Sequence, residues 1–200
     1  MNRHDVILFL GLFAIIGSAG ILSFLGQYDV SGMATTATST SSAIISAYLS
    51  IASSNNLSSG ISFGTISAIP SGDVNATGNA YNSTGNFAGD ASGYNISVSS
   101  DSNVAVDFCI KADSQFNTTA NDTIPLTNYT YTWSSASNGT FPKNGTNGTA
   151  ITTSYVKTNT SIAAGGNEFY RFFLDVPPAQ AAGTYDNTIS FEGVQTTTSC

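Results

Sequence analysis

The stretch VAVDFCIKA at Val104–Ala112 decides the fold class of this 200-residue chain. Apolar side chains occupy every second position on one face, at Val104, Val106, Phe108 and Ile110. The opposite face carries an alanine, an aspartate, a cysteine and a lysine. A period of two residues is typical of a β-strand with one face in a core. The stretch is therefore predicted to be a half-buried strand.

Similar alternating stretches recur on both sides of this one, separated by residues that favour turns. Further strands are predicted at Ala43–Ala52, within Leu57–Ile69 (which contains GISFGTI), at Tyr94–Ser99, Tyr129–Trp133, Ile151–Val156 and Glu168–Val176, and from Gly183 to Phe191. The segment Asp101-Ser102-Asn103 is predicted to be the turn of a hairpin, and Pro70-Ser71-Gly72-Asp73 a second turn.

No stretch after residue 42 has the period of an amphipathic helix. Many short strands with turn signals between them favour two packed sheets over other architectures. We therefore expect residues 43–200 to form an all-β domain. Its expected architecture is an immunoglobulin-like β-sandwich of about eight or nine strands.

An apolar run of 21 residues, Val6–Gly26, precedes this domain and contains no charged residue. As a helix it would extend ~31 Å, the thickness of the hydrocarbon core of a bilayer. Arg3 precedes the run and Asp29 is the first charge after it, an asymmetry that predicts a cytoplasmic N-terminus and export of the rest. Residues 1–26 are thus predicted to be a signal peptide or membrane anchor, and residues 27–42 a flexible arm rich in serine and threonine.

Whether the apolar run is retained stays open. Its full length favours a retained membrane anchor, because the apolar region of a cleaved signal peptide is shorter. Small residues nevertheless allow cleavage after Gly20, Ala34 or Ala37. In either case the membrane is a predicted partner through residues 6–26, at least during export.

The composition points to a glycosylated exterior protein. Only 8% of the residues are charged and the net charge is -7, which excludes the basic surface that nucleic-acid binding needs. Heavy N-glycosylation would keep such a weakly charged surface soluble. The Asn-x-Ser/Thr sequons are Asn56, Asn75, Asn82, Asn95, Asn117, Asn121, Asn128, Asn138, Asn144, Asn147 and Asn159.

The chain has two cysteines, Cys109 and Cys200. In an oxidising compartment, such a pair is most simply a disulfide. The alternatives are an intermolecular link or lipid attachment at Cys200, or free thiols.

Residues for catalysis are scarce in the exported part. The single histidine, His4, precedes the apolar run, so a Ser-His-Asp or Cys-His site cannot form beyond it. Zinc loses its usual ligands for the same reason. We expect neither an enzyme nor a cofactor. The only metal to consider is a structural Ca²⁺ at the oxygen-rich turns Asp101–Asn103, Asn121–Asp122 and Asp186–Asn187, where capped turns are the simpler explanation.

Two motifs carry a resemblance to a known class of proteins. GISFGTI with the following Pro70-Ser71-Gly72, and VPPAQAAGTYDNTISF at Val176–Phe191, resemble strand signatures of secreted prokaryotic immunoglobulin-like surface domains. The dense sequons and low charge resemble archaeal cell-surface proteins, including subunits of thread-type and bundling-pilus filaments.

The resemblance implies an incomplete sandwich whose missing strand is supplied by the N-terminal extension of a neighbouring subunit. That extension would be Ser31–Ala52, with Ala43–Ala52 as the donated strand. Its inward residues would be Ile45, Ala47, Leu49 and Ile51. Subunits of such filaments are normally freed from their signal peptide, and here the long apolar run departs from that pattern.

The resulting expectation is a structural glycoprotein of the cell surface, a subunit of an extracellular filament or coat whose partner is itself or another surface protein. One alternative is a membrane-anchored adhesion or binding module with a glycosylated ectodomain. A second is a pilin-like subunit with Val6–Gly26 in the filament core, although no basic-Gly processing site precedes the run.

Overall fold

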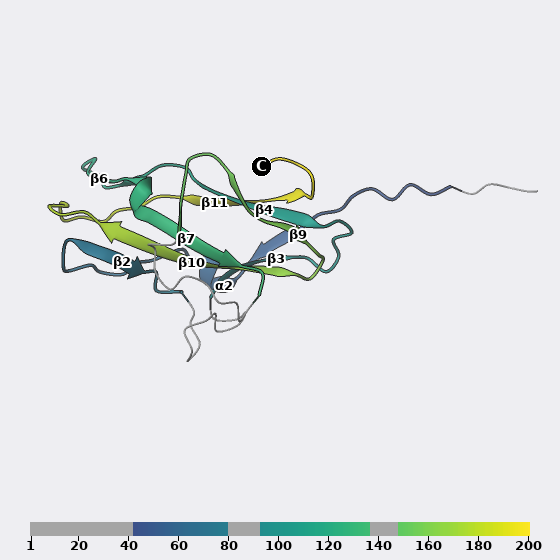
Figure 1. The fold of residues 1–200 in the computed structure, drawn as a ribbon, viewed down its shortest axis with the longest axis horizontal. Coiled ribbons are helices and arrows are strands. Elements are labelled where there is room, and N and C mark those ends of the chain that lie inside the picture. The colour runs from purple at the N-terminus through teal and green to yellow at the C-terminus, as the bar shows by residue number, and fades with distance from the viewer. Residues whose placement is uncertain (1–41, 80–92, 137–147) are drawn as a thin grey trace, which may run out of the picture. The chain divides into compact units, whose positions relative to one another are not determined.

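The structure is a computed structural model that describes residues 42–79, 93–136 and 148–200. The predictions for residues 1–26, and for the arm up to residue 41, lie outside the described residues. Residues Ile45–Cys200 form one compact unit, and this unit is mostly β (Figure 1). The predicted fold class is therefore confirmed at the level of antiparallel sheets packed together.

The two main sheets differ in size. The larger has six strands in the order β1-β3-β10-β7-β8, with β2 pairing β10 beyond the end of β3; the smaller has three, in the order β11-β4-β9. The larger sheet consists of β1 (Ile51–Ser53), β2 (Ser71–Asn75), β3 (Tyr94–Val98), β7 (Tyr129–Ser134), β8 (Thr149–Ala150) and β10 (Asn167–Val176). The smaller consists of β4 (Val106–Ala112), β9 (Val156–Ile162) and β11 (Ile189–Gln195). The remaining elements are α2 (Asn55–Ser58), the 3-10 turn η1 (Leu126–Asn128) and the short pair β5 (Phe116–Asn117) and β6 (Thr123–Ile124).

The core lies between the two sheets, where the alternating patterns placed it. Phe108 and Ile110 of β4 are buried, as are Tyr170 and Phe172 of β10. Aromatic rings fill the centre in edge-on and tilted contacts, for example Tyr170 against Phe191 with ring centroids 5.2 Å apart. Such pairs add about 0.5–1.5 kcal/mol each beyond the area they bury.

Strand β10 is buried on both faces. The side chains on its face away from the smaller sheet, Phe169, Arg171 and Phe173, are between 0% and 3% exposed. This strand lies inside its sheet, paired with β7 on one side and with β3 and β2 on the other. Its continuous run of large side chains follows from that position.

Several local predictions were wrong. The expected hairpin does not form, because β3 belongs to the larger sheet and β4 to the smaller, so the turn at Asp101–Asn103 carries the chain between sheets. Ser71–Asn75 is a strand rather than a turn, because its backbone pairs with β10 beyond the end of β3.

Two further strand predictions also differ from the structure. The segment Ile151–Tyr155 is irregular, and the strand in this region is β9, whose polar sequence VKTNTSI buries only Thr158 and Ile162. GISFGTI packs on the core through Ile61, Phe63 and Ile66 but forms no strand.

The disulfide predicted between Cys109 and Cys200 is present. It fixes the last residues of the chain to the outer face of β4. Polar contacts reinforce the attachment: the Lys157 ammonium donates to the Thr198 carbonyl at 2.9 Å and to Asp107 at 2.7 Å, and the Thr196 hydroxyl donates to Asp107 at 2.9 Å. Burial alone would raise the pKa of Asp107, but the hydrogen bonds from Lys157, Ser161 and Thr196 hold it below its usual value.

Replacing both cysteines by alanine is expected to destabilise the fold by about 2–5 kcal/mol. The bridge joins residues 91 apart in the sequence, and closing so long a loop restricts the unfolded chain. Urea unfolding of the full chain, with and without the substitutions, measures the loss. A double variant as stable as the parent would contradict the expectation.

Candidate functional site

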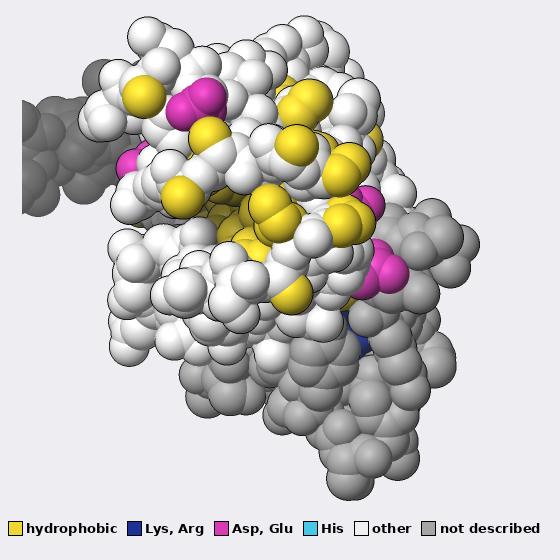
Figure 2. All heavy atoms as spheres, turned by 90° about the vertical axis from the view of Figure 1, so that its left-hand side faces the viewer, with side chains coloured by type: hydrophobic (Ala, Val, Ile, Leu, Met, Phe, Trp, Pro, Cys, Tyr) yellow, Lys and Arg dark blue, Asp and Glu magenta, His cyan; other side chains and the backbone are white. Residues whose placement is uncertain are grey.

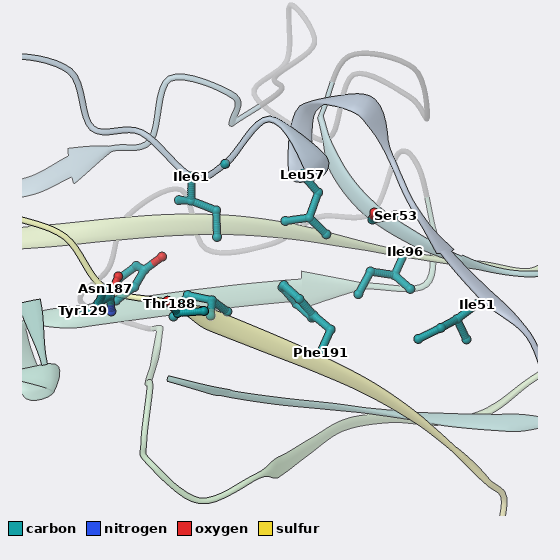
Figure 3. Close-up of a pocket in the computed structure, with 11 residues that line it drawn as sticks. Ile51, Ser53, Leu57, Ile61, Ile96, Tyr129, Asn187, Thr188 and Phe191 are labelled. Atoms are coloured by element: carbon teal, nitrogen blue, oxygen red, sulfur yellow. The ribbon is translucent and has the colours of Figure 1, made fainter. Parts of the chain in front are cut away.

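The site with the clearest functional geometry is a groove at one open side of the sandwich. Two hollows form it, and both are lined by Ile61. The first, of about 510 Å³, lies between residues 51–61 on one wall and 187–191 on the other. Leu57 and Ile61 face Phe191 and Thr188 across it (Figure 3). This hollow lies where the β1 edge of the larger sheet approaches the β11 edge of the smaller sheet.

The second hollow, of about 700 Å³, continues to the end of the domain. One wall is the segment Ile61–Ile69 and the other is the loop Gln180–Asp186, with Phe116 and Leu174 also among the lining residues. In the space-filling view of this end, apolar side chains surround a central hollow (Figure 2). Together the two hollows are called the groove.

Strand β11 presents an unpaired edge to the groove. Thr196 donates its N–H to the Ala105 carbonyl, and Asp113 donates its N–H to the Thr188 carbonyl. Both bonds keep the register of the β11–β4 ladder. Because hydrogen-bonded residues alternate along an antiparallel strand, the backbone groups of Ile189, Phe191 and Gly193 point away from β4. Among the described residues, none forms a backbone hydrogen bond with them.

Strand β1 presents a second unpaired edge. Ser54 donates its N–H to the Asn95 carbonyl and Ser99 donates to the Ser50 carbonyl, so the even-numbered residues bond to β3. The backbone groups of Ile51 and Ser53 therefore point away from β3. The two edges approach closely at Gly193, where a Cβ would lie 2.8 Å from a methyl carbon of Ile51. Glycine at this position lets the narrow end of the groove close.

The opposite edge of the smaller sheet is protected. The pairing of β9 with β4 has two register shifts, and Ser161 has a positive φ of 59°. Lys157 projects from the outer face of β9. Irregular backbone and charged residues are the usual protection of an edge against further pairing. Strand β11 has seven residues in unbroken register with β4 and no such irregularity.

The predicted donor residues divide into two groups. Leu49 and Ile51 pack against the core of their own chain, and the strand there is limited to Ile51–Ser53. Ile45 is 85% exposed, and Ala47 is also exposed. Ile44, the residue before Ile45, is 96% exposed.

Asn103 holds the start of this segment. Its side chain accepts from the Tyr48 N–H at 2.7 Å and donates to the Ser46 carbonyl at 2.9 Å. This contact also gives the Asp101–Asn103 turn a structural role. Among the described residues, no three or more acidic, histidine or cysteine side chains gather where a metal ion could bind.

The described sequons lie outside the groove, since none of their asparagines lines either hollow. Their accessibility differs. Asn75 and Asn121 are exposed, Asn56, Asn117, Asn128 and Asn159 are half-buried, and Asn95 is buried. Asn82, Asn138, Asn144 and Asn147 lie outside the described residues.

Glycan occupancy is expected to follow the accessibility of the side-chain nitrogen that carries the sugar. Asn121, exposed on a turn with φ 67°, should be glycosylated in protein from the native host. Asn95, which is 7% exposed, and Asn159, whose Nδ2 is buried, should be bare. Peptide mapping by mass spectrometry measures each site. Equal occupancy at Asn95 and Asn121 would contradict this pattern.

A buried carboxyl group lies in the core and is not among the residues that line the groove. Glu168 on the inner face of β10 has no exposed surface, and among the described residues neither of its oxygens has a hydrogen-bond partner. Burial raises its pKa to about 7, a rise that the nearby hydroxyls of Thr158 and Tyr170 only partly oppose. The sequence placed Glu168 at the start of a predicted strand but gave no sign that its carboxyl group is buried.

The stability of the fold is expected to depend on pH through Glu168. The folded state keeps the proton up to about pH 7, whereas the unfolded carboxyl loses it near 4.5, so stability should fall between these values by roughly 3 kcal/mol and stay level above. Glu168→Gln should remove this slope and raise the stability at pH 8. Urea unfolding at a series of pH values tests this, with Glu192→Gln on the outer face as control. An unchanged slope in Glu168→Gln would show the expectation to be wrong.

Comparisons of the chain with protein-family models, with curated proteins and with solved structures find no match. In the described ranges there is no helix long and apolar enough to cross a membrane. The disulfide is consistent with an oxidising, extracytoplasmic location. The function must therefore be argued from the groove.

Proposed function

We propose that this chain is a structural glycoprotein of the cell surface, a subunit of an extracellular filament or coat assembled by donation of an N-terminal strand. The observation that carries the proposal is the groove, a channel lined by apolar and uncharged polar side chains and bordered by unpaired edges of both sheets. An extended peptide satisfies such a site in two ways. Its backbone pairs with an open edge, and every second side chain enters the hollow.

A second copy of the chain fits the groove by its chemistry. Among the described residues that line the groove, Asp186 is the only charged one, so an uncharged segment with apolar side chains fits it. Three of the four large apolar side chains that are exposed in the described residues lie together before β1, at Ile44, Ile45 and Tyr48. Exposed apolar side chains on one copy and an apolar groove on another bury each other on contact.

The donated stretch is refined by the packing of Leu49 and Ile51 in their own core. We place the donated part before Tyr48, with Ile45 and Ala47 as residues that enter the groove of the next subunit. Residues 31–42, rich in serine, threonine and alanine, then extend the donated segment and the linker.

The geometry favours an open, polar assembly. Strand β4 begins after Asn103, which binds the segment before β1, and ends before Phe116, which lines the wide end of the groove. The donor segment and this groove opening therefore lie at opposite ends of the domain (Figure 1). Contacts between unlike surfaces can repeat from copy to copy, and they build a filament when the rotation between successive copies does not close a ring.

The test uses two variants of the full chain that block opposite partners of the contact. Ile45→Asp places a charge on the donor, and Ile61→Asp places one on the groove wall. Burying an unpaired charge costs several kcal/mol, so each variant alone should lose assembly by at least about tenfold in concentration. Thr153→Asp, an exposed position away from both, is the matched control and should assemble like the parent. Sedimentation velocity and electron microscopy measure assembly.

Mixing the two blocked variants separates donation between chains from pairing within one chain. The groove of Ile45→Asp and the donor of Ile61→Asp remain intact, so the mixture should give dimers that neither variant forms alone. A mixture that stays monomeric, or blocked variants that still form filaments, would overturn the proposal.

A further inference from the structure

The segment Ile61–Ile69 forms much of one groove wall but has almost no backbone pairing. Within the described part of the chain, its only backbone–backbone hydrogen bond is from the Thr77 N–H to the Ser62 carbonyl, at 2.7 Å. The Gly64 N–H is held by the Ser62 hydroxyl at 3.2 Å. An apolar segment of alternating sequence thus lies at the side of a β-sandwich without being a strand.

Side-chain packing nevertheless fixes the first part of this segment. Phe63 contacts Phe116 and Tyr129 edge-on, with ring centroids 6.2 and 5.6 Å apart. Ile61 packs on the same core. This packing holds the segment in place beside the groove, because moving it away would expose Phe63 to solvent.

The direction of the backbone groups follows from this packing. Ile61 and Phe63 point inward while Ser62 between them is exposed, which is the alternation of an extended chain. The Ser62 carbonyl points to Thr77, beside the larger sheet. The backbone groups of Ile61 and Phe63 therefore point to the other side, away from that sheet.

We propose that residues 61–63 are a latent strand, whose backbone groups at Ile61 and Phe63 hydrogen-bond to the segment that enters the groove. The partner is an extended, apolar segment of a second copy, so the inference rests on the proposed function. The entering strand pairs with β11 on one side and with residues 61–63 on the other, and joins the two sheets across their open side.

In this arrangement, the backbone N–H and C=O groups that point into the groove from β11 and from residues 61–63 all gain hydrogen-bond partners. A donor that paired only with β11 would leave the groups of Ile61 and Phe63 beside it without partners, and backbone groups covered in this way cost about 1–3 kcal/mol each. Pairing on both sides satisfies them. It also limits the occupant to a peptide without proline at the positions that donate to the walls.

Amide hydrogen exchange of the full chain tests the inference, with assembled parent compared with the monomeric Ile45→Asp variant. Peptides covering residues 57–69 and 186–195 are followed by mass spectrometry. Those of β4, already paired on both sides, are the internal control. We expect exchange to slow at least tenfold on assembly in both wall peptides and to stay unchanged in β4.

The outcomes separate the two proposals. Slower exchange at 186–195 with none at 57–69 would overturn the latent strand and leave strand donation intact. Assembly without slower exchange in either peptide, or a parent chain that never assembles, would overturn strand donation and the latent strand together.

Discussion

The unequal width of the two packed sheets is the constraint on which the rest of the structure depends. A six-stranded and a three-stranded sheet share one apolar core, so the smaller cannot cover the larger from edge to edge. On the side of β9 the smaller sheet ends in an irregular edge. On the side of β11 the edge is regular, and the described residues that line the gap there include Leu57, Ile61, the segment that follows Ile61 and the loop Gln180–Asp186. The groove is the part of the core that the smaller sheet leaves uncovered.

The sequence predicted well those strands whose own alternation of apolar and polar residues shows which face is buried. Alternation in Val104–Ala112 and Glu168–Val176 correctly gave the inward faces of β4 and β10, because a strand in the middle of a sheet must bury at least one face. Strand β9 was missed since an edge strand with a solvated outer face needs few apolar residues, and only Thr158 and Ile162 are buried. The hairpin between β3 and β4 failed for another reason: alternation does not tell which sheet a strand joins.

The candidate site was predictable only in part. The pairing of Cys109 with Cys200 followed from counting cysteines, and the donor residues came from a family resemblance. The groove itself was not predictable, because its walls come from segments far apart in the sequence, such as Ile51–Ile61 and Asn187–Phe191. Sequence did indicate a strand at GISFGTI, and the structure explains the mismatch. The side chains there alternate as in a strand, while among the described residues the backbone makes a single backbone hydrogen bond, from Thr77 to Ser62.

The anchoring of the C-terminus has a mechanical consequence. Cys200 is covalently joined to Cys109 in the middle of a buried strand, so tension applied between Ser42 and Cys200 passes through the sulfur atoms. Residues 110–199, which include β7, β9, β10 and β11, lie outside that load path. Under such tension the part that can lengthen is the chain before Cys109, which includes β1 and the groove wall Ile61–Ile69, whereas β11 carries none of the load.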